Sequence, residues 1–223
     1  MTTNFDLQLA EKYAPYIYFD RKEPFFPVRV GVTVFSEAGR SGSFNREFRF
    51  DNPKLKHVIE YAIYWDYDIQ HLYEMEHVWI FVGQDGEVLD CEASFHGRYL
   101  KGLLKDRSNI EDGTHAKLYS QPGKHAFSPM AELFELLPDL REATNVRAGN
   151  GGLIVTGIYE GVYTTNEEKN RIVEQYLQKF RFDPAMEFER YVIPRDLYVP
   201  WEQLYKEIPQ RIESCLAEIR AAL

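Results

Sequence analysis

Two long runs of aromatic and β-branched residues, joined by the segment Gly83-Gln84-Asp85-Gly86, constrain the fold of this 223-residue chain most strongly. The runs cover residues 73–82 and 87–95, and a third run, residues 61–68, precedes them. Such residues fit the pleated surface of a sheet, and a short glycine-containing joint between two of these runs is typical of a hairpin. The sequence therefore predicts antiparallel pairing at the centre of the fold.

Acidic residues and histidines interrupt these runs. Four carboxylates and two imidazoles fall within the twelve residues 66–77, namely Asp66, Asp68, His71, Glu74, Glu76 and His77. Side chains alternate along a strand, so Glu74 and Glu76 are expected on one face, where they repel unless a cation or a shared proton separates them. Because nothing basic lies on that face within the segment, we predict a metal site with His71, Glu74, Glu76 and Asp68 as ligands. His77 falls on the opposite face and is interpreted as a core or supporting imidazole.

Two further histidines, His96 and His125, are candidates for a fourth ligand or a catalytic acid–base group. The position of His96 depends on the hairpin register. A three-residue loop with Gly86 in the left-handed conformation pairs Gly83 with Glu87 and places His96 opposite Glu74. A two-residue turn would put His96 on the other face. We favour the longer loop because it requires glycine at position 86.

The remaining segments predict helices around this β-core. Helices are expected at residues 5–13, at 130–137 after Ser128-Pro129, from the capping box Thr165-x-x-Glu168 through Phe180, and at the end of the chain, where Pro209 is tolerable only in the first turn. Further extended segments are expected at residues 28–34, 44–50, 115–120 and 153–163, the last after a glycine-rich loop at 145–152. The predicted fold is α+β, a single domain spanning 1–223 with an antiparallel β-sandwich-like core decorated by peripheral helices.

The composition limits the kinds of partner that the protein is expected to bind. The net charge of −9 argues against nucleic acid or an anionic membrane and favours a small molecule or a protein. No apolar run is long enough to span a bilayer, and Met1–Asp6 shows no secretion signal, so we expect a cytoplasmic protein with Cys91 and Cys215 reduced. The chain has no Gly-x-Ser-x-Gly elbow, phosphate-binding loop or dinucleotide fingerprint.

Residues 70–78, Gln-His-Leu-Tyr-Glu-Met-Glu-His-Val, resemble the signature Gly-His-Arg-His-Asp-Trp-Glu of the necrosis- and ethylene-inducing-peptide-like proteins. His71, Glu74 and Glu76 fall on that family's His, Asp and Glu, which bind a divalent metal at the rim of a β-sandwich. Gln70, Tyr73, Glu74 and Met75 depart from the signature, and Asp66 or Asp68 would stand for its upstream aspartate. The family's secreted role transfers poorly, because the sequence shows neither a secretion signal nor disulfide potential.

A second resemblance is to a vacuolar-protein-sorting-associated family of poorly defined function. It rests on Tyr13-Ala14-Pro15-Tyr16-Ile17-Tyr18-Phe19 with Glu23 and Pro27, on the Glu74/Glu76 strand, and on Gly123-Lys124-His125-Ala126. Both resemblances concern roughly the first 130 residues. Together they imply a metal-centred β-sandwich more than any particular activity.

The leading hypothesis is a metal-dependent enzyme, a hydrolase or lyase acting on a small molecule. A mixed histidine and carboxylate site suits Zn²⁺, Mn²⁺ or Fe²⁺ better than Mg²⁺ or Ca²⁺. The alternative is a non-catalytic module in which the ion organises a surface for a sugar or lipid headgroup. A third hypothesis has no metal, with the carboxylates sharing protons in a structural network. The sequence leaves the substrate and the oligomeric state open.

Overall fold

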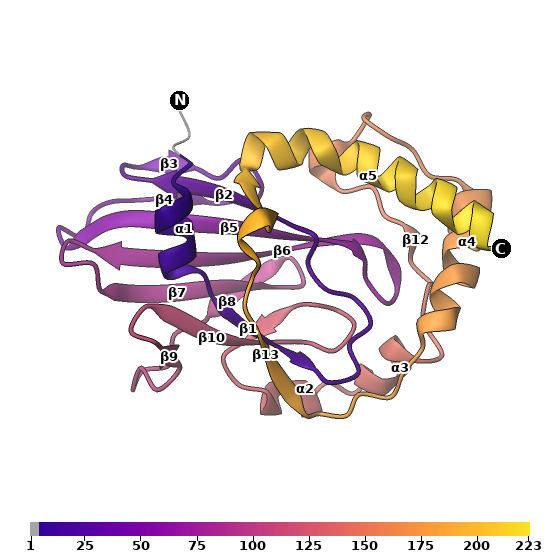
Figure 1. The fold of residues 1–223 in the computed structure, drawn as a ribbon, viewed down its shortest axis with the longest axis horizontal. Helices are drawn as coiled ribbons and strands as arrows, with labels where there is room; N and C mark the ends of the chain where they lie inside the picture. The colour runs from indigo at the N-terminus through magenta and orange to yellow at the C-terminus, as the bar shows by residue number, and fades with distance from the viewer. Residues whose placement is uncertain (1–4) are drawn as a thin grey trace.

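The computed structural model describes residues 5–223. The prediction that Met1–Asp6 carries no secretion signal concerns mainly residues 1–4, which lie outside this range. Two mixed sheets form its centre, and the helices lie around them (Figure 1). The strands are β1 (Tyr16–Asp20), β2 (Arg29–Phe35), β3 (Gly39–Arg40), β4 (Glu47–Phe48), β5 (Leu55–Tyr67), β6 (His71–Gly83), β7 (Val88–Phe95), β8 (Arg98–Lys101), β9 (Ile110–Glu111), β10 (His115–Ser120), β11 (Phe127–Ser128), β12 (Gly152–Leu153), β13 (Phe188–Tyr191) and β14 (Tyr198–Pro200).

The larger sheet has seven strands, with the main order β14-β2-β5-β6-β7-β8 and β12 paired to β6. The smaller sheet has the order β11-β10-β1-β13, with β9 paired to β10. Antiparallel pairing dominates, but β1–β10, β2–β14 and β6–β12 are parallel. The predicted α+β fold with a sandwich-like core is therefore confirmed, with mixed sheets in place of purely antiparallel ones.

The two faces of the larger sheet carry different residues. One face of β5 and β6 joins the main hydrophobic core through residues such as Ile59, Ile63 and Ile80. The other face carries a smaller cluster around Val58 and Trp79, which packs against the segment containing β3 and β4. The acidic side chains Glu74 and Glu76 alternate with His77, which lies on the side of Trp79 as predicted and stacks on its ring.

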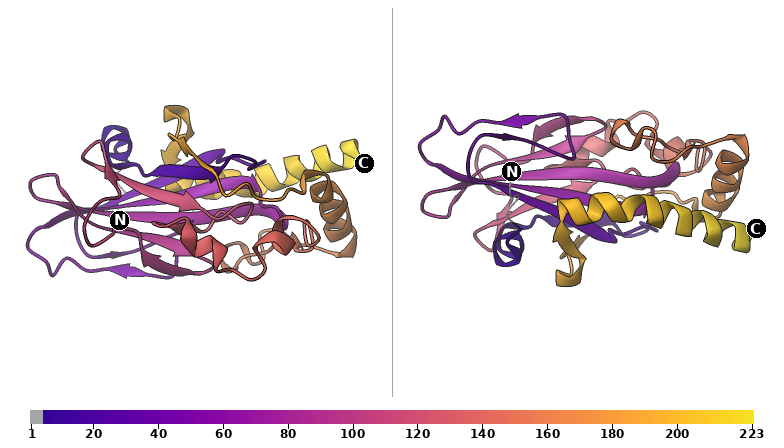
Figure 2. Two further views of the ribbon diagram at one scale, coloured as in Figure 1. Left: turned by 90° about the horizontal axis from the view of Figure 1, so that it is seen from below. Right: turned by 90° about the horizontal axis from the view of Figure 1, so that it is seen from above.

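The helices are α1 (Leu7–Tyr13), α2 (Glu132–Glu135), α3 (Leu140–Thr144), α4 (Glu167–Leu177) and α5 (Trp201–Ala222), with 3₁₀ turns η1 (Gly157–Tyr159), η2 (Gln178–Phe180) and η3 (Arg195–Leu197). Figure 2 shows the long helix α5 running along the core toward α4 at one end of the molecule. Helix α1 begins where Asp6 accepts a hydrogen bond from the Leu9 backbone, and it ends before Pro15 as predicted.

Three helix predictions need correction. The helix expected at 130–137 shrinks to the four residues of α2, because Ser128 belongs to β11 and its hydroxyl bonds to Met130 instead of capping a helix. The cap of α4 is Asn166, which accepts from the Lys169 backbone, and not Thr165. Pro209 lies well inside α5 and not in its first turn, because the apolar stripe of α5 packs on the core both before and after the proline.

The strand expected at residues 153–163 is also wrong. Only Gly152–Leu153 pairs, in parallel with His71–Leu72, and the chain then turns into η1. The side chains of Tyr159 and Tyr163 are buried in an aromatic cluster with Tyr73, so apolar residues here fill the core without joining a sheet. Apolar content alone does not separate these two outcomes.

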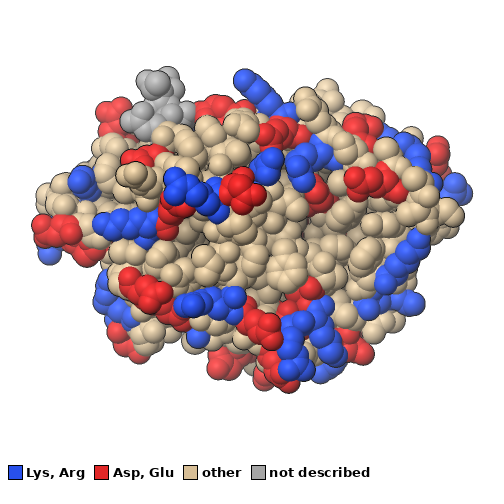
Figure 3. Space-filling model, in the orientation of Figure 1, with Lys and Arg blue, Asp and Glu red and all other residues tan. Residues whose placement is uncertain are grey.

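Surface charge is mixed on the face shown in Figure 3, where basic and acidic side chains are interspersed around an area free of charged residues. No helix among residues 5–223 has both the length and the hydropathy needed to cross a membrane. Cys91 and Cys215 are both buried and unpaired, as predicted for reduced thiols.

Candidate metal centre

Two turns, far apart in the sequence, carry the candidate site. The first connects β5 to β6 and contains Asp68, whose Oδ1 accepts from the Gln70 backbone at 2.7 Å. The second follows β10 at residues 121–126. The Ile69 backbone N–H donates to the Gly123 carbonyl oxygen at 2.9 Å, which ties the two turns together. Gly123 has a φ of 69°, and an added Cβ would lie 2.8 Å from Ile69, so this close approach requires glycine.

Asp68, His71 and Glu74 converge in space. One ligand atom from each lies within 4.8 Å of the others. Nε2 of His71 is 3.5 Å from Asp68 Oδ1 and 3.5 Å from Glu74 Oε2. On a regular strand His71 and Glu74 would point to opposite faces. Tyr73 between them has a φ of 53°, and this left-handed residue interrupts the alternation.

The protonation of His71 suits a ligand. Its Nδ1 donates to the Tyr73 carbonyl oxygen at 2.8 Å, which leaves the Nε2 lone pair facing the two acidic side chains. Burial lowers the pKa of His71 to about 4, so the ring is neutral at physiological pH. A neutral imidazole with its second nitrogen held by a carbonyl is the form that binds metals.

The carboxyl groups of Asp68 and Glu74 differ in the direction of their pKa shifts. Burial acts to raise the pKa of Asp68, but the neighbouring His71, Lys124 and His125 outweigh it, and the pKa lies below its ordinary value. Burial, followed by the charges of Glu76 and Asp68, raises the pKa of Glu74 well above its ordinary value. Burial therefore favours the protonated form of Glu74, whereas a bound metal would favour the ionised form.

Lys124 supplies a positive charge that the local sequence does not reveal. Its Nζ donates to Asp68 Oδ1 at 2.7 Å and lies 3.2 Å from His71 Nε2, and the side chain is almost fully buried. The ammonium group thus occupies part of the space among the three lone-pair donors. Any metal ion bound there must share or displace this interaction.

A second side of Asp68 faces His125. Asp68 Oδ2 and His125 Nδ1 are 3.9 Å apart, both buried, and neither has a hydrogen-bond partner. His125 also lies 3.3 Å from Glu23 through Nε2 and stacks on Trp65, so its ring is fixed. Buried polar atoms without partners are uncommon and point to a missing ion or water. The orphaned oxygen of Asp68 fits the requirement of a bound cation.

Glu76 lies beside this group but outside the three-residue cluster. Its Oε2 accepts from the Ser94 hydroxyl. Burial raises the pKa of Glu76 to about 7, although the Ser94 hydrogen bond acts in the opposite direction. Of the four predicted ligands, the structure brings Asp68, His71 and Glu74 together, with Glu76 held by Ser94 at the edge.

The register prediction for His96 is wrong. The Gly83 N–H donates to the Glu87 carbonyl oxygen and Gly86 is left-handed, as predicted. A β-bulge between Phe81 and Val82 then shifts the pairing by one residue, so that Val78 pairs with Ala93. His96 lies exposed in the turn after β7, where its Nε2 contacts Gln121 at 2.7 Å. It is not part of the Asp68 cluster, whereas His125 is adjacent to it.

Sequence reasoning missed Lys124, Glu23 and Ser94 as neighbours of the site. Glu23 accepts from the Gly123 backbone at 2.7 Å, and so fixes the turn that presents Lys124. Glu23 and Gly123-Lys124-His125-Ala126 both belong to the second resemblance, and the structure places them in contact. The presence of both segments in one resemblance was the signal that could have placed them together. Their residue types alone do not indicate that they are close in space.

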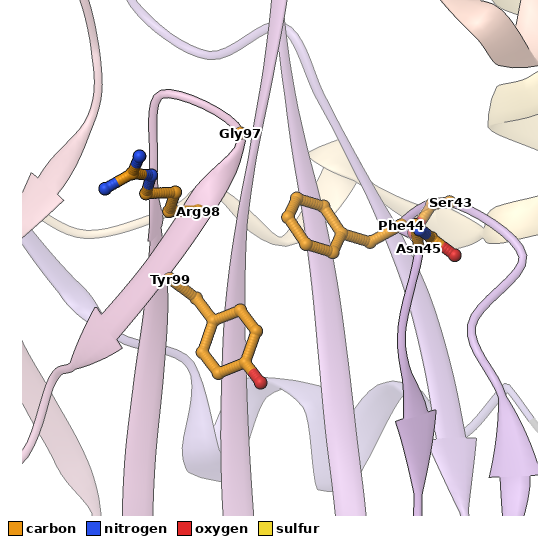
Figure 4. Close-up of a pocket in the computed structure, with 6 residues that line it drawn as sticks. All are labelled: Ser43, Phe44, Asn45, Gly97, Arg98 and Tyr99. Atoms are coloured by element: carbon orange, nitrogen blue, oxygen red, sulfur yellow. The ribbon is translucent and has the colours of Figure 1, made fainter.

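A pocket of about 300 Å³ adjoins the cluster at Glu74. It is lined by residues 43–44, by Tyr73, Glu74, Met75 and His77 of β6, and by residues 156–158. A second pocket, of about 490 Å³, shares Ser43 and Phe44 with the first and lies toward Gly97, Arg98 and Tyr99. Figure 4 shows the Phe44 and Tyr99 rings extending toward one another, while Arg98 points away.

No family model matches the chain, and no curated protein matches it. Among solved structures it is similar to NLPPya in complex with glucosamine, at 19% identity over 56% of this chain and 68% of that chain, with a TM-score of 0.37. It is also similar to Necrosis and Ethylene inducing Protein 2 from the causal agent of cocoa's witches' broom disease, at 17% identity over 67% and 84% of the two chains, with a TM-score of 0.38.

These structures come from the group of proteins that residues 70–78 resemble. The similarity is confirmed, but at such low identities and TM-scores it carries no inference about activity or ligands.

Proposed function

We propose that this protein binds a divalent metal ion at Asp68, His71 and Glu74 and acts with it on a small molecule. The observation that carries the proposal is the convergence of a neutral imidazole nitrogen and two carboxyl groups within 4.8 Å. The orphaned Oδ2 of Asp68 supports it, because a cation is the simplest partner for a buried carboxylate oxygen. Glu76 is a further donor at the edge of the same group.

The donor set favours Zn²⁺, Mn²⁺ or Fe²⁺, because imidazole nitrogen combines with carboxylate oxygen, and Mg²⁺ or Ca²⁺ is less suited. When bound with an open position, such an ion lowers the pKa of water or polarises a carbonyl group. Two contacts orient the side chains that would bind the ion. The Tyr73 carbonyl oxygen fixes the His71 ring, and the Ser94 hydroxyl orients Glu76. The pocket beside Glu74 favours enzymatic use, as a hydrolase or lyase, because it offers space for a small molecule.

The second candidate is a non-catalytic module that recognises a sugar or lipid headgroup. The pocket between Phe44 and Tyr99 favours it, because two aromatic rings with Asn45 nearby offer both stacking and polar contacts. Turnover by metal-loaded protein would select the enzyme, whereas saturable binding of a headgroup without turnover would select the module.

We expect about one equivalent of Mn²⁺ or Zn²⁺ to bind per chain. At 100 times its dissociation constant, the ion should raise the free energy of unfolding by about 2.7 kcal/mol. Isothermal titration calorimetry on chelator-treated protein without a histidine tag measures the stoichiometry, and thermal unfolding measures the stabilisation. Less than a tenth of an equivalent with every divalent metal tried would refute the proposal and favour a proton-sharing network.

Lys124→Met is expected to strengthen Mn²⁺ binding by about tenfold, equivalent to roughly 1.4 kcal/mol. The reason is that the ammonium group donates to the same atoms of Asp68 and His71 that would bind the ion. Lys117→Met is the matched control, because Lys117 lies on β10 over the rings of Tyr18 and Tyr119, away from the cluster. Equal or weaker Mn²⁺ binding by Lys124→Met would show that the lysine does not compete with the metal.

A further inference from the structure

The pocket beside Glu74 has walls from three segments that are distant in the sequence. Phe44 comes from the loop between β3 and β4, Met75 from β6, and Ile158 from η1. Glu74 lines the same pocket and also belongs to the candidate metal centre. A molecule in this pocket would contact Glu74 at one end and apolar side chains over the rest.

The polar groups that line the pocket mostly bond to one another. The Tyr73 hydroxyl lies 2.6 Å from Thr156 Oγ1. Ser43 Oγ donates to Glu60 at 3.0 Å and lies 3.0 Å from His77 Nε2. His77 Nδ1 has no partner, but it is shielded from solvent. Few hydrogen-bonding groups other than Glu74 are thus available to a ligand.

We propose that the ligand of this pocket is an amphiphilic small molecule with an apolar body and a single metal-binding oxygen head. The inference rests on the proposed function, because the head binds the ion held at Glu74. The body, an aromatic ring or a short branched chain, packs against Phe44, Met75 and Ile158.

This chemistry excludes a sugar as the preferred ligand of the pocket. A sugar would bring several hydroxyl groups into walls whose polar atoms are already bonded, and each unpaired polar group costs about 1–3 kcal/mol. An apolar body gains about 0.8 kcal/mol for each methylene-sized group that it buries. The volume of about 300 Å³ accommodates a single ring with its head group.

The test compares three probes on Mn²⁺-loaded protein. Benzohydroxamate and acetohydroxamate share one metal-binding head and differ in the apolar body, whereas glucosamine is a sugar. We expect benzohydroxamate to bind at least about tenfold more tightly than acetohydroxamate, with glucosamine too weak to compete. Titration of free Mn²⁺ with both hydroxamates measures how far their intrinsic affinities for the ion differ. This difference is subtracted from the one measured on the protein.

Two sets of variants locate the effect. Met75→Gln keeps the volume but places an amide in the wall, so the preference for benzohydroxamate should fall at least about threefold, whereas Met75→Leu should retain it. Gly157→Phe should weaken benzohydroxamate binding at the rim, because an added Cβ there meets no atom within 4 Å and the fold need not change. Mn²⁺ affinity, measured by electron paramagnetic resonance, should stay unchanged in all three variants.

The outcomes separate the two proposals. Wild-type protein that binds no Mn²⁺ overturns the proposed function and this inference with it. Protein that binds Mn²⁺ but shows no preference for benzohydroxamate, or that binds glucosamine more tightly, overturns this inference alone. A preference that survives both Met75→Gln and Gly157→Phe also overturns it, since the apolar body would then lie elsewhere.

Discussion

Asp68→Asn is expected to abolish metal binding and to lower the free energy of unfolding of the metal-free protein by about 3–5 kcal/mol. Asp68 is fully buried, and its Oδ1 accepts from both the Gln70 backbone and Lys124 Nζ. The amide has nearly the same shape but no charge, so the buried ammonium of Lys124 loses its counterion. Urea unfolding in a chelator measures the stability, and calorimetric titration with Mn²⁺ measures the binding.

Asp139→Asn is the matched control for this substitution. Asp139 pairs with Arg147 at the surface, with about half of its side chain exposed, so its removal should cost less than about 1 kcal/mol and leave Mn²⁺ binding intact. If Asp68→Asn binds Mn²⁺ within threefold of the wild type, Asp68 is not a ligand. If it also unfolds at the same urea concentration, the ion pair with Lys124 contributes nothing to stability.

Much of the β-core follows from local sequence. Residues 61–68, 73–82 and 87–95 are rich in the aromatic and β-branched side chains that favour strands, and each lies within or overlaps an observed strand. The turn at Gly83-Gln84-Asp85-Gly86 was predictable because only glycine tolerates the φ of 81° at position 86. The register shift beside Phe81 and Val82 was not, because the extra residue is Leu89 of β7, and a leucine does not mark a bulge by type.

The candidate site, too, could be predicted from the sequence only in part. Asp68, His71 and Glu74 lie within seven residues, so the sequence could mark them as one group of candidate ligands. Their actual arrangement depends on the left-handed Tyr73, a conformation that an aromatic residue rarely adopts. Lys124 and His125 reach the cluster through the parallel pairing of β1 with β10, the contact of Ile69 with Gly123 and the hydrogen bond from Gly123 to Glu23. Such long-range pairing leaves no local pattern in the sequence.

The helices show where propensity yields to packing. Pro209 removes a backbone donor and should end a helix, yet α5 continues through it because Ile208 and Ile212 are buried on either side. The run after Leu153 has the composition of a strand, but Tyr159 and Tyr163 pack against Tyr73 instead. In both places tertiary contacts, which the sequence does not display, decide the local structure.

Glu76→Gln is expected to stabilise the metal-free protein increasingly as the pH rises, by about 2–3 kcal/mol between pH 5 and pH 8. The pKa of Glu76 is about 7 in the folded protein and 4.5 ordinarily, so the folded state binds more protons between these values. The resulting stability is fully present below pH 4.5 and is lost as the pH rises through 7. Glutamine resembles the protonated acid, keeps a hydrogen bond with Ser94 and does not ionise, so the variant avoids this loss.

His71 acts in the opposite direction, so the effect of Glu76 is measured as a difference between proteins that all retain His71. Its folded pKa of about 4 lies below the ordinary 6.5, so the protein loses stability as the pH falls from 6.5 through 4. Above pH 6.5 this contribution is constant, and the decline that remains comes from acids with raised pKa such as Glu76. Urea unfolding in a chelator from pH 5 to 8, on wild type, Glu76→Gln and the exposed control Glu47→Gln, isolates the difference. Parallel profiles for wild type and Glu76→Gln would mean that Glu76 ionises at its ordinary pKa in the folded protein, whereas added Mn²⁺ should reduce the wild-type decline if the acidic side chains serve the ion.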